Sequence, residues 1–366
     1  MSTKKRVVVA MSGGVDSSTA AAILVSQGYD VIGISLHLFD YSPYSPKGFG
    51  TCCSIADIED ARRVSEKLNI PFYVINFEKE FKDEVIDYFL SQYLSAKTPN
   101  PCILCNQKIK FQHLLRKSKE IGAEYLATGH YARIGFDEKD KTYYVKKGID
   151  SDKDQSYFLF NLTQNELPSL LFPVGEYTKK EVRGIAKKFS LKISEKKESQ
   201  EICFIPDNDY PSFIRRESSL KSFCPGNIVN LEGEVLGKHQ GIPFYTVGQR
   251  RGIGVATGNP IYVLQLKPET NEVVVGSRAE LKTESCIVED IIINGMPEDF
   301  EEIRCTIKYR YRTKEAEALL TKLSANRIMC KFLKPQYAIT PGQAAVFYDG
   351  ETVLGGGWIK EVINAK

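Results

Sequence analysis

The stretch Val7-Val8-Val9-Ala10-Met11-Ser12-Gly13-Gly14-Val15-Asp16-Ser17-Ser18 decides the fold of the N-terminal part of this chain. Its small and β-branched apolar residues predict a buried parallel strand that ends in a Ser-Gly-Gly turn. Residues 19–27 then predict a helix that is stopped by Gly28. A glycine-rich turn between a strand and a helix N-terminus directs backbone N–H groups at one point, so this stretch predicts a phosphate site.

The loop Ser12–Ser18 contains no lysine, which excludes the Walker type of phosphate loop. Its pattern S-G-G-x-D-S-[ST] resembles the pyrophosphate loop of the ATP pyrophosphatases, which split ATP between its α and β phosphates. The resemblance implies that the loop holds the departing pyrophosphate while AMP is attached to a substrate oxygen. The hydroxyls of Ser12, Ser17 and Ser18 would add donors, and Asp16 would hold Mg²⁺ on the phosphates.

Composition places the chain among globular proteins of more than one domain. It has 366 residues, of which 42% are hydrophobic and 26% charged. Its net charge is only +3, from 49 basic and 46 acidic residues. The overall charge therefore does not indicate a nucleic-acid partner, and binding of one would need a local basic surface.

The chain contains no signal peptide pattern and no apolar stretch of membrane-spanning length, so we expect a cytoplasmic protein without a membrane partner. In that compartment its nine cysteines should be thiols unless they are catalytic or bind metal.

Strand and helix patterns alternate through the first part of the chain. Strands are predicted at 30–36, 71–77 and 124–128, a helix around 61–69 and a long amphipathic helix at 79–96. This alternation predicts an α/β domain with a doubly wound parallel sheet over residues 1–205. Ligands bind such sheets at the carboxyl ends of the strands, which is where the Ser12 loop, Leu36 and Gly129 fall.

Residues 206–366 show different sequence patterns from those of the first part. Glycine and proline punctuate residues 206–280, which predicts a small loop-rich middle domain. Short alternating strands dominate residues 281–366 and predict a C-terminal β-barrel, with strands at 286–293, 303–312, 327–333, 344–348 and 353–359.

Three cysteines fall on segments where a thiol has little packing to do. Cys102 and Cys105 form a C-x-x-C on a loop bounded by prolines, and Cys203 lies in the segment 199–204. An adenylated oxygen is a good leaving group for attack by a nucleophile. Thiolate or persulfide sulfur is the strongest nucleophile that a protein offers. ATP activation beside loop thiols therefore suggests sulfur insertion. The other cysteines are expected to be structural: Cys52, Cys53, Cys224, Cys286, Cys305 and Cys330.

At this point the chain resembles, from end to end, the bacterial tRNA-specific 2-thiouridylases. The resemblance rests on the following segments: 10–17, Asn100-Pro101 with Cys105-Asn106, 128–132, 153–157, 199–205, 237–241, 245–250 and 341–343.

The resemblance implies a persulfide mechanism for 2-thiolation of the wobble uridine of tRNA. Uracil O2 attacks the α-phosphorus of ATP, pyrophosphate leaves, and a persulfide sulfur on Cys203 displaces AMP at C2. Cys105 is the partner thiol, which either releases the sulfur or closes a Cys105–Cys203 disulfide afterwards. The implied ATP-binding residues are Ala10, Met11, Ser12, Gly13, Gly14, Val15, Asp16, Ser17, Leu36 and Gly129, and the target base would face Asn100, Pro101 and Cys102.

The RNA partner is also implied by the resemblance, which places tRNA on His130, Lys153, Asp154, Gln155, Arg310, Tyr311 and Gln343. Residues 303–312 alternate an apolar and a basic face. Taken alone, that pattern is typical of a solvated barrel strand. With Lys146-Lys147 and the segment 249–251, it predicts a distributed phosphate-binding surface. The family expectation is tRNA for Lys, Glu and Gln, with a cysteine desulfurase or a sulfur-relay protein as persulfide donor.

One position departs from the family pattern, because many relatives carry Asp where this chain has Cys102. The change leaves Cys102, Cys105 and Cys203 as three thiols that could ligate an iron–sulfur cluster, which is the second interpretation. Two further alternatives stay open: an amidating enzyme of the same fold, and an RNA-binding module with an inactive nucleotide site.

Overall fold

The computed structural model describes residues 4–40, 55–196, 202–205, 209–218, 220, 222–256, 258–297 and 299–363. Cys52, Cys53 and the segment 199–201 lie outside these residues. The chain forms two compact units. Residues 1–85, 102–208 and 351–353 make the first unit, and residues 86–101, 209–350 and 354–366 make the second.

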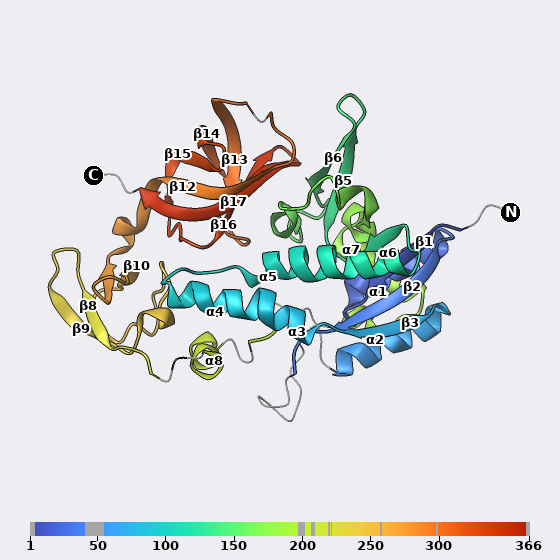
Figure 1. The fold of residues 1–366 in the computed structure, drawn as a ribbon, viewed down its shortest axis with the longest axis horizontal. Helices are drawn as coiled ribbons and strands as arrows, with labels where there is room; N and C mark the ends of the chain where they lie inside the picture. Colours follow the sequence, from blue (N-terminus) through green and yellow to red (C-terminus); the bar gives the residue numbers. More distant parts are fainter. Residues whose placement is uncertain are drawn as a thin grey trace. The chain divides into compact units, whose positions relative to one another are not determined.

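A parallel sheet forms the centre of the first unit and confirms the predicted α/β architecture (Figure 1). Its strand order is β3-β2-β1-β4-β7, and every pairing is parallel. Val7, Val8 and Val9 of β1 are fully buried because both faces of the central strand are covered. The strand bounds are β1 Arg6–Ala10, β2 Asp30–His37, β3 Phe72–Asn76, β4 Tyr125–Ala127 and β7 Leu170–Leu171.

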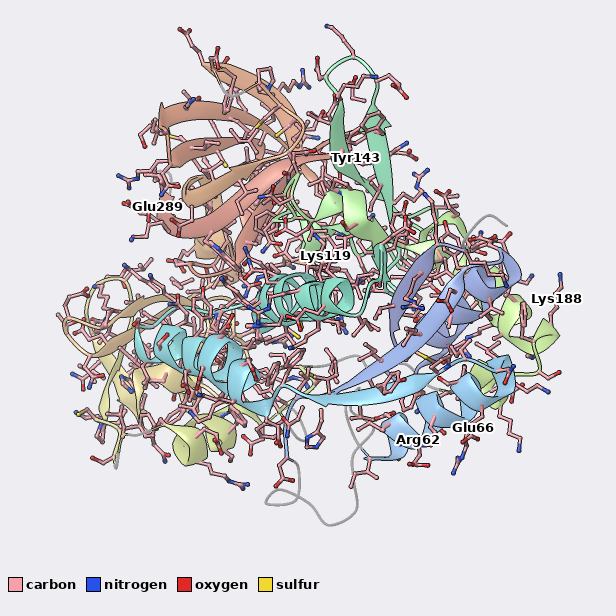
Figure 2. All side chains as sticks on the ribbon, turned by 45° about the vertical axis from the view of Figure 1, so that its right-hand side comes forward. Arg62, Glu66, Lys119, Tyr143, Lys188 and Glu289 are labelled. Carbon is pink, nitrogen blue, oxygen red and sulfur yellow. The ribbon has the colours of Figure 1, made fainter. Side chains whose placement is uncertain are left out.

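Helix α1 (Val15–Ser26) packs between this sheet and helix α7 (Lys179–Lys188). It begins directly after the glycine turn, earlier than the predicted start at Thr19. The three alanines of residues 20–22 are fully buried, since small side chains let a helix approach its neighbours on all sides. Helix α2 (Ile55–Leu68) is instead amphipathic, with Arg62 and Glu66 exposed (Figure 2).

The predicted helix at 79–96 is a helical run with a π-helical turn, and it passes from the first unit to the second at residue 86. Its parts are α3 Glu78–Phe81, the π-turn Lys82–Ile86 and α4 Asp87–Leu94. A second run follows, with α5 Pro101–Leu104, a π-helix Cys105–Leu114 and α6 Leu115–Glu120.

The placement of Cys102 and Cys105 on a loop is wrong, because both lie on this second helical run. Proline has no N–H to lose at the first position of a helix, so Pro101 starts the helix instead of bounding a loop.

A β-hairpin that the sequence did not predict extends the first unit. It consists of β5 (Ala132–Asp137) and β6 (Thr142–Lys147), with Tyr143 on its second strand (Figure 2). Residues 351–353 belong with it, because Thr352 pairs with Lys146. The Glu351 carboxylate also forms an ion pair with the Arg133 guanidinium at 2.8 Å.

The second unit holds the middle segment and the barrel. The middle segment has helix α8 (Tyr210–Glu217) and short strands in the order β10-β11-β8-β9, joined by loops. Their bounds are β8 Gly226–Val229, β9 Val235–His239, β10 Tyr262–Lys267 and β11 Glu272–Gly276. Helix α4 packs here, since the Tyr93 and Tyr210 rings stack at 5.1 Å.

The C-terminal strands close into the predicted β-barrel, in the order β12-β15-β14-β13-β16-β17 with β12 also paired to β17. Strand β14 was not predicted, and β13 ends before Arg310. The bounds are β12 Lys282–Ile293, β13 Glu302–Lys308, β14 Ala316–Ser324, β15 Arg327–Tyr337, β16 Ala344–Asp349 and β17 Thr352–Ile363. The domain boundaries near 205 and 280 stay a prediction.

The cysteines expected to be structural divide into two groups. Cys286, Cys305 and Cys330 are buried in the barrel core, and burial raises the pKa of Cys305 to about 12. Cys224 is exposed, so its expected place in a core is wrong. No helix in the described part of the chain is long and apolar enough to cross a membrane.

Candidate active site

The glycine turn after β1 has a shape that only glycine permits at its first position. Gly13 has φ +68°, and a β-carbon there would lie 2.1 Å from the carbonyl oxygen of Asp57. The Ser17 hydroxyl closes the turn, because it accepts from the Ser12 N–H at 3.1 Å and lies 3.3 Å from the Gly14 carbonyl, to which it donates. Ser17 is therefore used within the loop, and the hydroxyl of the exposed Ser12 lies 3.3 Å from that of Ser17.

The structure brings the three predicted nucleotide-binding segments to the carboxyl edge of the sheet. The loop follows β1, Leu36 lies near the end of β2, and Gly129 follows β4. A β-carbon on Gly129 would lie 2.5 Å from the Ser17 nitrogen, so this backbone lies directly against the first turn of α1. The Ser18 hydroxyl in that turn is buried and has no hydrogen-bond partner among the described residues.

Asp16 carries an ion pair that sequence reasoning missed. Lys179 Nζ donates to both carboxylate oxygens, at 2.8 and 2.9 Å, and the Tyr131 hydroxyl donates to Oδ1 at 2.8 Å. Lys179 follows Thr178, which caps helix α7 through a capping box with Glu181. That motif was readable in the sequence, but its nearness to the loop was not.

The expected Mg²⁺ ligand role of Asp16 stays a prediction. Both of its oxygens accept from the Lys179 ammonium group, and each carboxylate oxygen keeps a second lone pair that a cation could use. Lys179 also neutralises the carboxylate beside the glycine turn, which favours binding of an anion there.

The two cysteine-bearing segments pack on the same part of the first unit. The helix that carries Cys105 is tied to residues 77–84, because His113 Nε2 lies 2.6 Å from Glu84 Oε1 and its ring lies 5.8 Å from that of Phe77. Beside Cys203, the buried Phe204 ring lies 5.6 Å from Phe81. Cys102, Cys105 and Cys203 are all half-buried.

The iron–sulfur interpretation finds no support in this geometry. Among the described residues, which include Cys102, Cys105 and Cys203, no group of three or more Cys, His, Asp or Glu side chains is arranged to hold a metal ion.

In the second unit, the segment before the expected base-binding residues is held by a turn of the barrel. The Thr98 N–H donates to the Pro341 carbonyl at 2.9 Å. The Gln343 side-chain amide donates to the Thr98 and Pro99 carbonyls, at 2.9 and 3.2 Å. Asn100 and Pro101 follow directly, so Gln343 has an internal role at this point.

The expected tRNA-binding residues of the first unit are largely engaged inside it. The Asp154 carboxylate accepts from the backbone of Gly148 and Ser156, and the Gln155 side chain accepts from the Tyr131 N–H. His130 is buried against Phe111 and Phe172. Burial first, and nearby Lys110 second, hold the pKa of His130 well below its usual value. Lys153 is half-buried.

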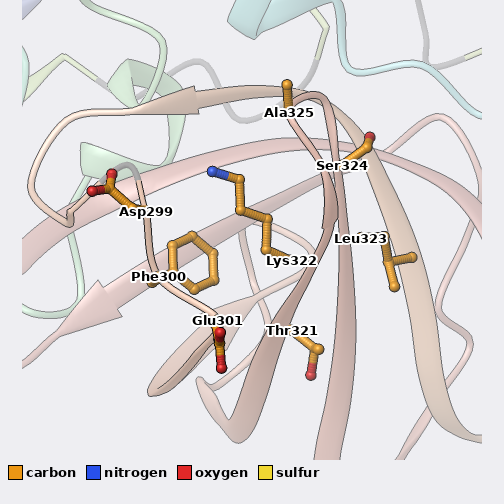
Figure 3. Close-up of a pocket in the computed structure, with 8 residues that line it drawn as sticks. All are labelled: Asp299, Phe300, Glu301, Thr321, Lys322, Leu323, Ser324 and Ala325. Carbon is orange, nitrogen blue, oxygen red and sulfur yellow. The ribbon is translucent and has the colours of Figure 1, made fainter.

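In the second unit, the Arg310 guanidinium donates to the Val247 carbonyl at 3.1 Å and to the Thr340 hydroxyl, so it ties the middle segment to the barrel. Tyr311 follows β13, with Lys308 Nζ lying 5.6 Å from its ring centre. A shallow hollow of 590 Å³ on the barrel is lined by residues 299–301 and 321–325 (Figure 3). It contains none of the predicted site residues.

Comparison with known proteins identifies the family. Three family models match in succession: the tRNA methyl transferase HUP domain over residues 5–207, the tRNA methyl transferase PRC-barrel domain over 212–277 and the aminomethyltransferase beta-barrel domain over 283–359. A curated tRNA-specific 2-thiouridylase MnmA of Geotalea uraniireducens is 52% identical, covering 99% of this chain and 97% of that protein. The chain belongs to the tRNA-specific 2-thiouridylase family.

Other members of the tRNA-specific 2-thiouridylase family match equally along their length. The protein from Carboxydothermus hydrogenoformans is 47% identical over 98% of both chains, and that from Geobacter metallireducens is 50% identical over 97% of both. The predicted resemblance is confirmed. The names of the family models mention methyl transfer, whereas these full-length relatives are named for thiolation.

Proposed function

We propose that this protein is an ATP-dependent tRNA sulfurtransferase that makes 2-thiouridine at the wobble position. The observation that carries the proposal is the meeting of the glycine turn, Leu36 and Gly129 at one edge of a sheet whose neighbouring segments bear Cys105 and Cys203. Its expected substrates are tRNAs for Lys, Glu and Gln, and a cysteine desulfurase or a sulfur-relay protein supplies persulfide sulfur.

In the first step the backbone N–H groups at the start of α1 hold the β and γ phosphates of ATP, whose Mg²⁺ is carried by the phosphates themselves. The positive end of the helix and the neutralised Asp16 favour those charges. Uracil O2 then attacks the α-phosphorus, and the bond to the pyrophosphate oxygen breaks. The uridine oxygen thereby becomes part of a good leaving group.

In the second step the terminal sulfur of the Cys203 persulfide attacks C2, and AMP leaves with its oxygen. The Cys105 thiolate then attacks Cys203 Sγ, which breaks the bond to the transferred sulfur and leaves a Cys105–Cys203 disulfide with the thiocarbonyl product. The position of Cys105 on a helix facing residues 77–84, where Phe204 also packs, supports this pairing.

The experiment that tests the proposal uses anaerobically purified full-length protein, unmodified tRNA, ATP, Mg²⁺ and a persulfide source. The tRNA is digested and 2-thiouridine is measured by mass spectrometry. Wild type and Cys102→Ser should form the product, and Cys203→Ser should lose it by at least about 10³-fold because the nucleophile is gone. Cys224→Ser is the matched control, since Cys224 is exposed and lies in the second unit.

Two results would contradict the proposal. Product formation by Cys203→Ser at the wild-type rate would remove the persulfide step. Loss in both Cys102→Ser and Cys203→Ser, with iron bound to wild type, would instead favour the cluster interpretation.

A further inference from the structure

Lys196 makes contacts that link three separate parts of the first unit. Its ammonium group donates to the Gly13 carbonyl at 3.1 Å, to Asp57 Oδ1 at 2.7 Å and to Asp60 Oδ2 at 2.5 Å. Gly13 belongs to the phosphate loop, and both aspartates lie on α2. One side chain therefore holds the loop and a neighbouring helix together.

The contact with Gly13 holds a tightly packed part of the loop. Gly13 has φ +68°, which glycine adopts without strain, and a β-carbon on it would lie 2.1 Å from the Asp57 carbonyl oxygen. A carbonyl that accepts a charged donor is held in one direction, and the Gly14 N–H, which shares its peptide plane, is held with it. Lys196 thus constrains the peptide unit that opens the anion cradle.

Charge strengthens this assignment. Without Lys196, the carboxylates of Asp57 and Asp60 would lose a cation that lies within 2.7 Å of each of them, beside the loop that is to receive phosphates. Burial lowers the pKa of Lys196, but the two aspartates more than offset it and the net shift is upward, so the residue stays cationic at neutral pH.

The backbone of Lys196 is also anchored, at the chain position that leads toward Cys203. Arg183 of α7 donates to the Lys196 carbonyl at 3.2 Å and to the Ser194 carbonyl. On the other side of Cys203, the Phe204 ring is held by Phe39 and Phe81. The chain that carries the sulfur is therefore fastened at Lys196 and at Phe204.

We propose that Lys196 is a positioning residue that shapes the phosphate loop for ATP and fastens to that loop one end of the segment carrying Cys203. This inference rests on the proposed function and adds a residue to it. The loss of Lys196 should weaken ATP binding first and sulfur transfer second, because the two anchored parts share one side chain.

The test compares Lys196→Met with Lys196→Arg and with Lys187→Met in full-length protein. Lys187 is exposed and pairs with the exposed Glu195 at 3.4 Å, so Lys187→Met is a matched control that should behave like wild type. Lys196→Met should raise the KM for ATP about tenfold or more in the thiolation assay, and Lys196→Arg should restore most of that loss because it keeps a cationic donor. Melting temperature is measured on every variant.

A KM for ATP within about twofold of wild type in Lys196→Met would overturn the inference, as would an equal rise in Lys187→Met. If Lys196→Met does not fold, Lys196→Gln takes its place, since it keeps a long polar side chain without the charge that pairs with Asp57 and Asp60. An unchanged KM for ATP in Lys196→Gln would then overturn the inference. Absence of thiolation by wild type would count against the proposed function, not against the role of Lys196.

Discussion

Single side chains set the electrostatics beside the phosphate loop. Asp16 and Lys179 form one ion pair, and Lys196 serves Asp57 and Asp60 together. Taking a charge partly out of water is costly unless an opposite charge compensates it. These pairs keep three carboxylates next to a site for an anion without repelling it, which the loop motif alone would not do.

Burial of His130 makes the stability of the folded chain depend on pH. Because burial lowers the pKa of His130, the unfolded chain binds a proton there more readily than the folded chain does. The stability contributed by the neutral ring is present above pH ~6.5 and is lost progressively as the pH falls below it.

Urea unfolding above and below that pH checks this expectation. His130→Gln should be less stable than wild type but should lose less stability than wild type on acidification. A residual loss from His239, whose pKa burial also lowers, should remain in both proteins. Equal pH slopes in wild type and His130→Gln would contradict the prediction.

Among the secondary-structure elements, strand β1, its glycine turn and helix α1 form one rigid strand–turn–helix segment. The strand is buried on both faces, and the helix is buried along most of its length. Rigid packing on both sides leaves the turn between them little freedom, so its backbone N–H groups are held in place before any ligand arrives.

Two glycines, one in this strand–turn–helix segment and one directly after it, allow the effect of backbone conformation to be separated from that of steric crowding. Gly13 and Gly28 both have positive φ, but a β-carbon on Gly13 would strike the Asp57 carbonyl, whereas on Gly28 it would meet nothing within 4 Å. Gly28→Ala should cost about 1–2 kcal/mol of stability and keep the KM for ATP. Gly13→Ala should also raise the KM for ATP about tenfold or more, because the loop must move.

Thermal melting and thiolation kinetics on both variants provide the measurement. A Gly13→Ala protein with wild-type KM for ATP would show that the turn tolerates displacement and does not shape the nucleotide site.

In the whole molecule, the C-terminal barrel also holds a distant part of the chain in place. Its turn Pro341–Gln343 holds the backbone of Thr98 and Pro99, and Gly342 is needed there because a β-carbon would lie 2.9 Å from the Thr98 nitrogen and oxygen. The barrel thereby positions the residues that lead into Asn100 and Pro101, which the family resemblance assigns to the target base.

Gln343→Leu should therefore affect the RNA substrate more than the nucleotide. The two lost hydrogen bonds to partly buried carbonyls should raise the KM for tRNA about tenfold, with the KM for ATP nearly unchanged. Gln336→Leu is the matched control, since its side chain bonds inside the barrel, donating to the Lys334 carbonyl and accepting from the Tyr309 hydroxyl. A larger effect on ATP than on tRNA in Gln343→Leu would contradict this role.

The elements whose signals are local could be predicted from the sequence alone. The apolar run before Ser12, the glycines after it and the alternation of strands and helices were enough to predict the parallel sheet and the phosphate loop at its edge, because they depend on neighbouring residues. The C-terminal barrel followed from alternating strands in the same way.

Which distant side chains lie beside the glycine turn could be seen only in the folded chain. Lys179 and Lys196 are far from the loop in sequence, and their ordinary lysine pattern does not mark them; folding brings each to a carboxylate beside the glycine turn. It also turned His130, Asp154, Arg310 and Gln343 toward internal partners, and it placed Cys102 and Cys105 on a helix. Long-range contacts of this kind are set by packing of the whole chain, which no local pattern encodes.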